Sequence, residues 1–155
     1  MTVNSGLSPA GAGESDSAGS GVGQPVPGRD VLGLDVGGAH VKGARVRGGR
    51  LVEAFQIAAP TWQGLHRLAA ALKETRERSA GVDRIAVTLT AELADAFPSR
   101  PVGVAALAEM LAGTFAGLPV AIYGGRAGFL PLAAAAAHAG DIASANWHAT
   151  AALVA

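Results

Sequence analysis

Hydrophobic and polar positions alternate in the chain from residue 31 onward, and the period of the alternation changes along it. Three runs with a period of two, at residues 31–36, 41–47 and 51–57, predict three β-strands. The Gly48-Gly49 pair lies between the second and third runs. Two glycines at such a place favour a tight hairpin, because primed turns need positive φ. The three runs therefore predict an antiparallel meander.

A helix is predicted next, beginning at Pro60-Thr61 and ending near Gly81. Its hydrophobic residues recur every three or four positions, so they form one stripe on the helix surface. These residues are Leu65, Leu68, Ala69 and Leu72. Charged residues dominate positions 73–78, which predicts a solvent-exposed face toward the C-terminal end of the helix.

Strands and helices alternate in the predicted second half of the chain. Residues 84–90 alternate cleanly and predict a fourth strand. The other predicted elements are a short helix or loop at 90–97, an amphipathic helix at 104–115, a strand at 119–123, a glycine loop at 124–128, a buried helical stretch at 129–138, and a last helix, capped by Asp141 or Ser144, that runs to the C-terminus. Because strands joined through a helix run parallel to a neighbour, the sequence predicts an α/β fold with a mixed sheet.

Residues 1–29 differ in composition from the rest of the chain. They are rich in Gly, Ser, Pro and Ala and hold almost no large hydrophobic residue. Such a segment buries too little surface to offset the entropy cost of ordering it. We therefore expect a disordered tail over residues 1–29 and one folded domain over residues 31–155.

Charge and cysteine content exclude several classes of protein. Twelve basic and twelve acidic side chains give a formal net charge of zero, so we expect no nucleic-acid partner. The chain has no cysteine, which excludes a disulfide framework, a thiolate zinc site and a cysteine nucleophile. No apolar stretch reaches the ~20 residues of a membrane helix, and no secretory signal is visible. We expect a cytoplasmic protein with no membrane partner.

The first candidate site is the turn between the first two predicted strands. Asp35 lies near the end of a buried strand, and Gly37-Gly38 follows it. Glycines can take positive φ and let a ligand approach the backbone N–H groups, so this turn can cradle a phosphate while Asp35 holds a divalent cation. Lys42 faces either solvent or the phosphate. The alternative is a plain hairpin with an aspartate at its lip.

The second candidate site follows the predicted fourth strand. Two hydroxyls and two carboxylates lie at the carboxyl end of that strand, which is where α/β sheets bind ligands. They belong to Thr88, Thr90, Glu92 and Asp95. Glu92 and Asp95 are three residues apart, so on a helical turn they would share a face and form an acid/base or metal-binding pair. The alternative is that the two carboxylates merely favour the N-terminus of a short helix.

The third candidate site is the Asn146-Trp147-His148 triplet in the last predicted helix. Three residues able to form hydrogen bonds inside an alanine-rich segment suggest that a polar group is bound there. The alternative is that Trp147 packs in the core while its neighbours make local hydrogen bonds.

These motifs resemble those of the actin-like ATPase superfamily, which includes sugar kinases, actin and the hydantoinase/oxoprolinase proteins. The Asp-x-Gly-Gly turn resembles the first phosphate-binding motif of that superfamily. Many of its sugar kinases place a Thr after the second glycine, whereas this chain has Ala39. Residues 35–42, 87–95 and 145–151 together resemble one hydantoinase/oxoprolinase-like family. That family is linked with tetrahydromethanopterin-dependent one-carbon transfer, and its archaeal members act in methanofuran biosynthesis.

The resemblance implies a fold, a reaction and roles for the candidate residues. The fold would be one ribonuclease H-like lobe of an actin-like enzyme. The reaction would join the phenol of γ-glutamyltyramine to a furanylmethyl diphosphate, releasing pyrophosphate and forming an aryl ether. Mg²⁺ at Asp35 would assist the leaving group, and Glu92 or else Asp95 would be the general base. The phosphate-binding residues would be Gly37, Gly38, Ala39, His40 and Lys42, and the substrate-binding residues Thr90, Asn146, Trp147 and His148.

The resemblance also implies a missing part and leaves rival functions open. Members of the family are about twice as long, with a second Asp-Gly-rich phosphate motif after the Asn-Trp-His helix. We therefore expect residues 31–155 to be one lobe, with the second lobe absent or supplied by another chain or by an oligomer, and the chain alone to be inactive. The rivals are an ATP-dependent sugar-kinase-like enzyme or hydantoinase-type hydrolase, and an inactive orphan lobe.

Overall fold

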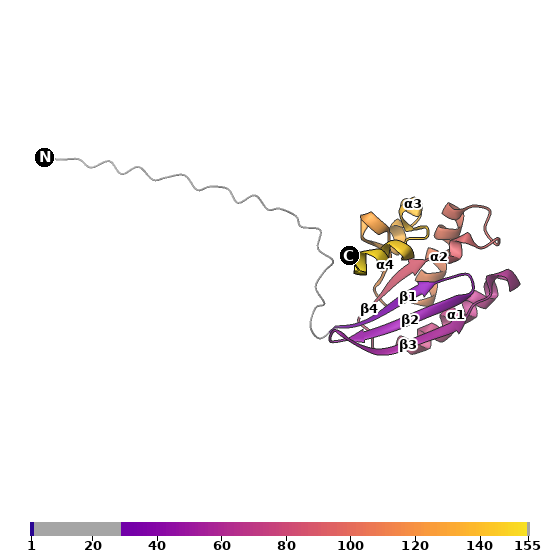
Figure 1. Ribbon diagram of the computed structural model, residues 1–155, viewed down its shortest axis with the longest axis horizontal. Coiled ribbons are helices and arrows are strands. Elements are labelled where there is room, and N and C mark those ends of the chain that lie inside the picture. The colour runs from indigo at the N-terminus through magenta and orange to yellow at the C-terminus, as the bar shows by residue number, and fades with distance from the viewer. Residues whose placement is uncertain (2–28, 155) are drawn as a thin grey trace.

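A mixed six-stranded sheet forms the centre of the structure, in the order β3-β2-β1-β4-β5-β6 (Figure 1). The computed structural model describes residue 1 and residues 29–154. The strands are β1 (Asp30–Val36), β2 (His40–Arg47), β3 (Arg50–Ala58), β4 (Arg84–Leu89), β5 (Val120–Tyr123) and β6 (Phe129–Pro131). The first three form an antiparallel meander, β4 pairs in parallel with β1, β5 in parallel with β4, and β6 antiparallel to β5. The predicted α/β fold with a mixed sheet is confirmed.

Helices and single helical turns connect the strands. The helices are α1 (Leu65–Arg78), α2 (Arg100–Thr114), α3 (Ala139–Ile142) and α4 (Asn146–Val154), and the 3₁₀ turns are η1 (Thr61–Gln63), η2 (Ala91–Leu93), η3 (Gly125–Ala127) and η4 (Leu132–Ala134). Figure 1 shows α1 behind the sheet and α4 in front of it. Across the described residues, no helix combines the length and apolar character that crossing a membrane requires.

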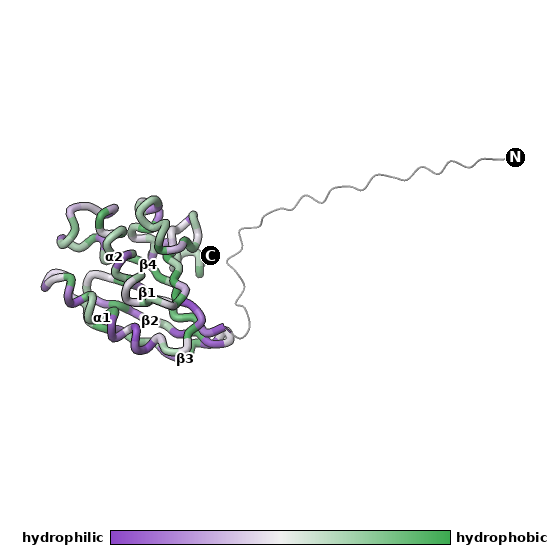
Figure 2. Tube along the Cα trace, turned by 180° about the vertical axis from the view of Figure 1, so that it is seen from behind, coloured by the Kyte–Doolittle hydropathy of each residue, from purple (hydrophilic) through white to green (hydrophobic). Residues whose placement is uncertain are grey.

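The hydrophobic core lies on the face of the sheet that α1 and α2 cover. Alternate residues of β1 and β4 are buried there, because successive side chains of a strand point to opposite faces. They pack against Leu68, Leu72, Leu107 and Leu111 from the two helices. Figure 2 shows hydrophobic segments gathered around β1 and β4 and hydrophilic ones along β3 and the outer side of α1. The intervening residues of β1, including Asp35, are only half-buried, so the second face of the sheet is more open.

The Gly48-Gly49 hairpin and the first helix show how far local sequence signals extend. Gly48 and Gly49 have φ of 55° and 78°, as expected for a primed turn between β2 and β3. The segment predicted as one helix from Pro60 is divided by Gly64, which has φ of 115°, into η1 and α1. The buried residues of α1 are Leu68, Ala71, Leu72 and Thr75, so the predicted stripe is shifted and Ala69 is exposed.

The prediction of a buried helix over residues 129–138 is wrong. Residues 129–131 form the edge strand β6, which pairs with β5, and η4 follows it. Phe129 has 62% of its surface exposed. A short apolar run does not distinguish a helix from a strand, and here the free edge of β5 provides backbone partners that determine the result.

The last predicted helix is also divided. α3 ends at Ile142 and α4 begins at Asn146, and Ser144 between them has φ of 56°. A serine in this left-handed region is held by its surroundings rather than by its own preference. Ala143 forms an isolated parallel bridge with Leu89, which fixes this joint at the end of β4. The tail predicted over residues 1–29 lies, apart from its two end residues, outside the described residues.

Candidate functional site

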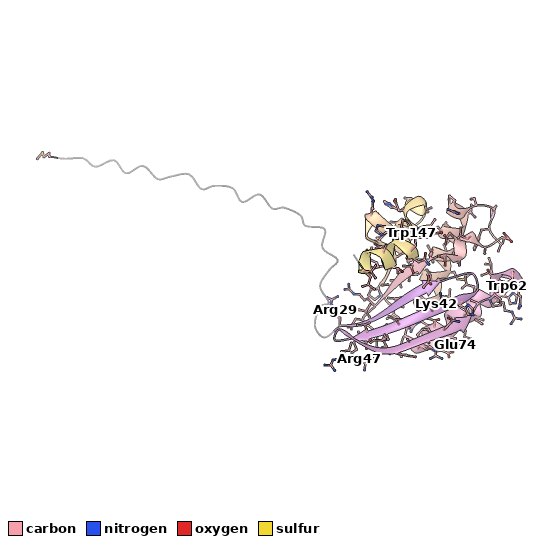
Figure 3. All side chains as sticks on the ribbon, viewed as in Figure 1. Arg29, Lys42, Arg47, Trp62, Glu74 and Trp147 are labelled. Carbon is pink, nitrogen blue, oxygen red and sulfur yellow. The ribbon has the colours of Figure 1, made fainter. Side chains whose placement is uncertain are left out.

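A cavity of about 1080 Å³ lies on the second face of the sheet, between the strands and α4. Small residues of β1 and β4, Gly33 and Ala86, form part of its floor, so little side-chain volume fills this space. Its polar lining residues are Asp35, Lys42, Thr88, Tyr123, Arg126 and His148. Figure 3 labels Lys42 on β2, which lines the cavity, and Trp147 on α4, which does not. All three candidate sites therefore contribute residues to one cavity.

Asp35 is placed in the cavity by strand register. Lys42 on β2 and Thr88 on β4 are its direct partners on either side. Lys42 Nζ lies 3.4 Å from Asp35 Oδ2, and the Thr88 hydroxyl donates to Asp35 Oδ1 at 3.3 Å. Exposed ion pairs contribute only about 0–1 kcal/mol, so Lys42 can leave Asp35 for a ligand at little cost.

Asp35 offers one carboxylate to a divalent cation. Within residues 29–154, no three His, Asp or Glu side chains lie close enough to bind a metal by themselves. Mg²⁺ is usually bound by one or two carboxylates together with substrate phosphates. The Asp35 carboxylate is 27% exposed, which leaves oxygen surface for such a cation. A cation bound here would take one carboxylate from this chain and its other ligands from a bound molecule or from water.

The turn after β1 is fixed by hydrogen bonds to its carbonyl groups. The Gly38 carbonyl accepts from the Thr61 amide at 2.9 Å and from the Thr61 hydroxyl at 2.8 Å. The Ala39 carbonyl accepts from the Ala59 amide at 2.7 Å. In the described part of the chain, the amides of Gly38 and Ala39 donate to no protein acceptor. These two adjacent N–H groups are available to an anion.

The two glycines of this turn are needed for space and not for positive φ. We expected a positive φ to be their use, but neither Gly37 nor Gly38 has one. A Cβ on Gly37 would lie 3.1 Å from the carbonyl oxygen of His40, and one on Gly38 would lie 3.2 Å from the Thr61 hydroxyl. Close approach of a ligand to the backbone of this turn stays a prediction. The group that approaches Gly38 in this structure is the Thr61 hydroxyl, and the sequence did not indicate it.

Thr90 lies beside this turn at the end of β4. Its amide donates to the carbonyl of Val36 at 3.0 Å, which joins the ends of the two parallel strands. A Cβ added to Gly37 would meet the Thr90 hydroxyl at 3.4 Å. Thr90 is therefore adjacent to the turn whose Gly38 and Ala39 amides are available to an anion, although Thr90 does not line the cavity.

Glu92 and Asp95 are not brought together. Glu92 is 2% exposed, and its Oε1 accepts from the Ser144 amide at 2.8 Å and the Ser144 hydroxyl at 3.0 Å. Its Oε2 is buried without a partner among the residues described. The chain becomes extended at Ala94 after η2, so Asp95 lies on the surface and does not share a helical face with Glu92. Neither carboxylate lines the cavity.

The Asn146-Trp147-His148 triplet contributes one residue to the cavity. His148 Nδ1 lies 2.9 Å from the hydroxyl oxygen of Tyr123, and both side chains line the cavity. Trp147 has 67% of its surface exposed, so it does not pack in the core. Asn146 Oδ1 accepts from the Trp147 amide at 2.8 Å, a local contact at the start of α4.

Thr88 belongs to the second candidate segment, and it is the residue of that segment that lines the cavity. Two other polar lining residues, Tyr123 and Arg126, were not among the candidates identified from the sequence. Tyr123 ends β5, which is the carboxyl end of a parallel strand and a common ligand-binding position. Nothing local marks Arg126, which lies in the glycine-rich turn η3.

Comparison with protein-family models gave no match, and neither did comparison with curated proteins.

Proposed function

We propose that this chain is one lobe of a two-lobe, actin-like enzyme of the hydantoinase/oxoprolinase type. In this proposal the enzyme couples a furanylmethyl diphosphate to the phenol of γ-glutamyltyramine and releases pyrophosphate, in the cytoplasm. The strand order β3-β2-β1-β4-β5, with β2 antiparallel to its neighbours, supports a ribonuclease H-like lobe. The site observations below support the chemistry.

The observation that carries the proposal is the position of Asp35 beside the turn after β1. Asp35 and Lys42 line the cavity. The amides of Gly38 and Ala39, which have no acceptor among the described residues, follow Asp35 by three and four residues and lie just outside the cavity lining. A carboxylate for the cation, a lysine and two N–H donors are the groups that a magnesium-bound diphosphate requires. Bound Mg²⁺ would neutralise charge on the departing pyrophosphate.

The residues of the chain would bind and orient the diphosphate. The turn amides would donate to its oxygens, and Lys42 would exchange its 3.4 Å contact with Asp35 for a phosphate oxygen. The other substrate, the phenol, would enter the cavity on the side of His148 and Tyr123. A second lobe would close over this open side and exclude water.

The rival ATP-dependent kinase or hydrolase places different demands on the turn. A hydroxyl after the second glycine would serve the γ-phosphate, and Ala39 has none. The nearby Thr61 hydroxyl does not replace it, because it donates to the Gly38 carbonyl at 2.8 Å. This observation favours a diphosphate ligand over ATP.

The test compares inorganic pyrophosphate with ATP, each with Mg²⁺, as ligands of the wild-type chain and of Ala39→Thr. We expect pyrophosphate to bind the wild type at least as tightly as ATP, and Ala39→Thr to improve neither affinity. Lys73→Gln on the exposed side of α1 is a control for general charge effects. ATP binding tighter than pyrophosphate binding, or ATP hydrolysis stimulated by Ala39→Thr, would overturn the proposal in favour of the kinase.

A further inference from the structure

The general base of the proposed reaction has to be found among residues that reach the cavity. Glu92 does not, because its carboxylate is buried and its Oε1 is held by Ser144 at 2.8 and 3.0 Å. Asp95 lies on the surface outside the cavity. Asp35 is bound to Lys42 and Thr88 and is the carboxylate suited to the cation. Among the described residues that line the cavity, His148 remains as a side chain that can accept a proton.

We propose that His148 Nε2 accepts the phenol proton and that Tyr123 is the positioning residue that holds His148 ready to do so. This inference rests on the proposed function and deepens it. Tyr123 Oη lies 2.9 Å from Nδ1, and within the described chain Nε2 has no hydrogen-bond partner. When Nδ1–H donates to the tyrosine oxygen, Nε2 carries a lone pair, which is the tautomer that a base requires.

Aromatic side chains around this pair fit the ring of a phenol. The rings of Tyr123 and Phe129 have centroids 5.1 Å apart and are tilted by 55°. The Tyr123 and His148 rings lie 5.9 Å apart, and Trp147 meets His148 edge-on at 5.8 Å. Centroid separations of about 4.5–7 Å are those at which aromatic rings attract one another. Phe129 lines the cavity and has 62% of its surface exposed, so it offers ring surface to an aryl ligand there, whereas Trp147 lies outside the cavity lining.

The proton and electron balance of the step is complete. The phenolic O–H bond breaks and its proton passes to Nε2, so neutral His148 becomes an imidazolium. The phenolate oxygen forms a bond to the furanyl methylene carbon, and the bond between that carbon and the diphosphate oxygen breaks. The electron pair leaves with pyrophosphate, and His148 later returns its proton to solvent. No oxidant or reductant is needed.

The test is ¹⁵N NMR of the histidine rings in the 155-residue chain, with 4-methylphenol as the aromatic probe. In the wild type we expect His148 to be protonated at Nδ1 and not at Nε2. We expect 4-methylphenol to shift the Nε2 signal of His148. His66, exposed on α1, is the internal control and should not respond. In Tyr123→Phe, which keeps the ring and removes only the hydroxyl, the proton should move to Nε2 and the affinity for 4-methylphenol should fall ~10-fold.

Two results would overturn this assignment. One is a wild-type His148 protonated at Nε2, and the other is an unchanged tautomer and probe affinity in Tyr123→Phe. Titration of pyrophosphate with Mg²⁺ into the same sample separates this inference from the function on which it rests. If pyrophosphate binds but His148 is protonated at Nε2, the proposed role of His148 is overturned and the proposed function stands. No pyrophosphate binding would overturn the proposed function, and the base assignment with it.

Discussion

The carboxylate of Glu92 accepts hydrogen bonds from both the amide and the hydroxyl of Ser144, at 2.8 and 3.0 Å. These bonds hold Ser144 at its φ of 56° and so direct the chain from α3 into α4. Because α4 carries His148 to the cavity, Glu92 acts on the site through the backbone. Its sequence position suggested catalysis, whereas its contacts indicate a positioning role.

Replacement of Glu92 should affect stability according to which hydrogen bonds survive. Glu92→Ala removes both bonds to Ser144, and we expect the free energy of unfolding to fall by about 2–3 kcal/mol. Glu92→Gln keeps an acceptor oxygen of the same shape, so its effect should remain within about 1 kcal/mol. Urea unfolding of the two variants measures this difference. Equal stability of Glu92→Ala and the wild type would contradict the positioning role.

Asp30 should make the fold sensitive to acid. Its carboxylate accepts from Arg45 Nε and Nη2 and from Arg47 Nε, each at 2.8 Å. The hydrogen bonds from Arg45 are the largest cause that lowers the pKa of Asp30 to about 2, while burial opposes them. A lowered pKa adds stability that is fully present above the unfolded pKa of about 3.9 and is lost as pH falls toward 2. Unfolding free energies measured between these pH values should show this loss.

Asp30→Asn is the matched variant for that pH series. It should lower stability at neutral pH by about 2–3 kcal/mol, because Arg45 loses its ionised partner, and it should flatten the pH dependence between 4 and 2. Arg47→Gln serves as a control, since Arg47 is 59% exposed and should cost less. An Asp30→Asn variant with the wild-type acid profile would show that other carboxylates account for the transition.

Gly43 on β2 should not tolerate a side chain while Phe55 keeps its place. A Cβ on Gly43 would fall within 2.1 Å of the Phe55 ring, so the ring must move. We expect Gly43→Ala to cost about 1–2 kcal/mol, since Phe55 is only half-buried and can shift. A double-mutant cycle with Phe55→Ala measures the coupling. Additive effects of the two substitutions would contradict the packing of this ring against Gly43.

The extent to which the sequence predicts this structure differs between its strands and its site. Four strands are predicted because hydrophobic and polar residues alternate cleanly within them and glycines or helices lie on either side. They are the strands near 31–36, 41–47, 51–57 and 84–90. The segment 129–138 is wrongly predicted as helix, because pairing with the edge of β5 depends on tertiary structure.

The candidate residues show the same limit. Asp35 and His148 are both identified from local motifs, but the cavity they share forms only because α4 returns over the second face of the sheet. The turn at Ser144 that allows this depends on Glu92, a residue far away in the sequence. Local patterns therefore identify candidate residues without showing which of them lie together in the fold.

The most direct test of the account is calorimetric titration of pyrophosphate with Mg²⁺ into the wild-type chain, Asp35→Asn and the control Glu109→Gln. Glu109 is an exposed carboxylate on α2, on the side of the sheet opposite the cavity. We predict that the wild type and Glu109→Gln bind pyrophosphate equally and only with Mg²⁺, and that Asp35→Asn weakens binding ~10-fold or more because the cation loses its protein carboxylate. Equal binding by Asp35→Asn and the wild type, or binding that needs no Mg²⁺, would contradict the account.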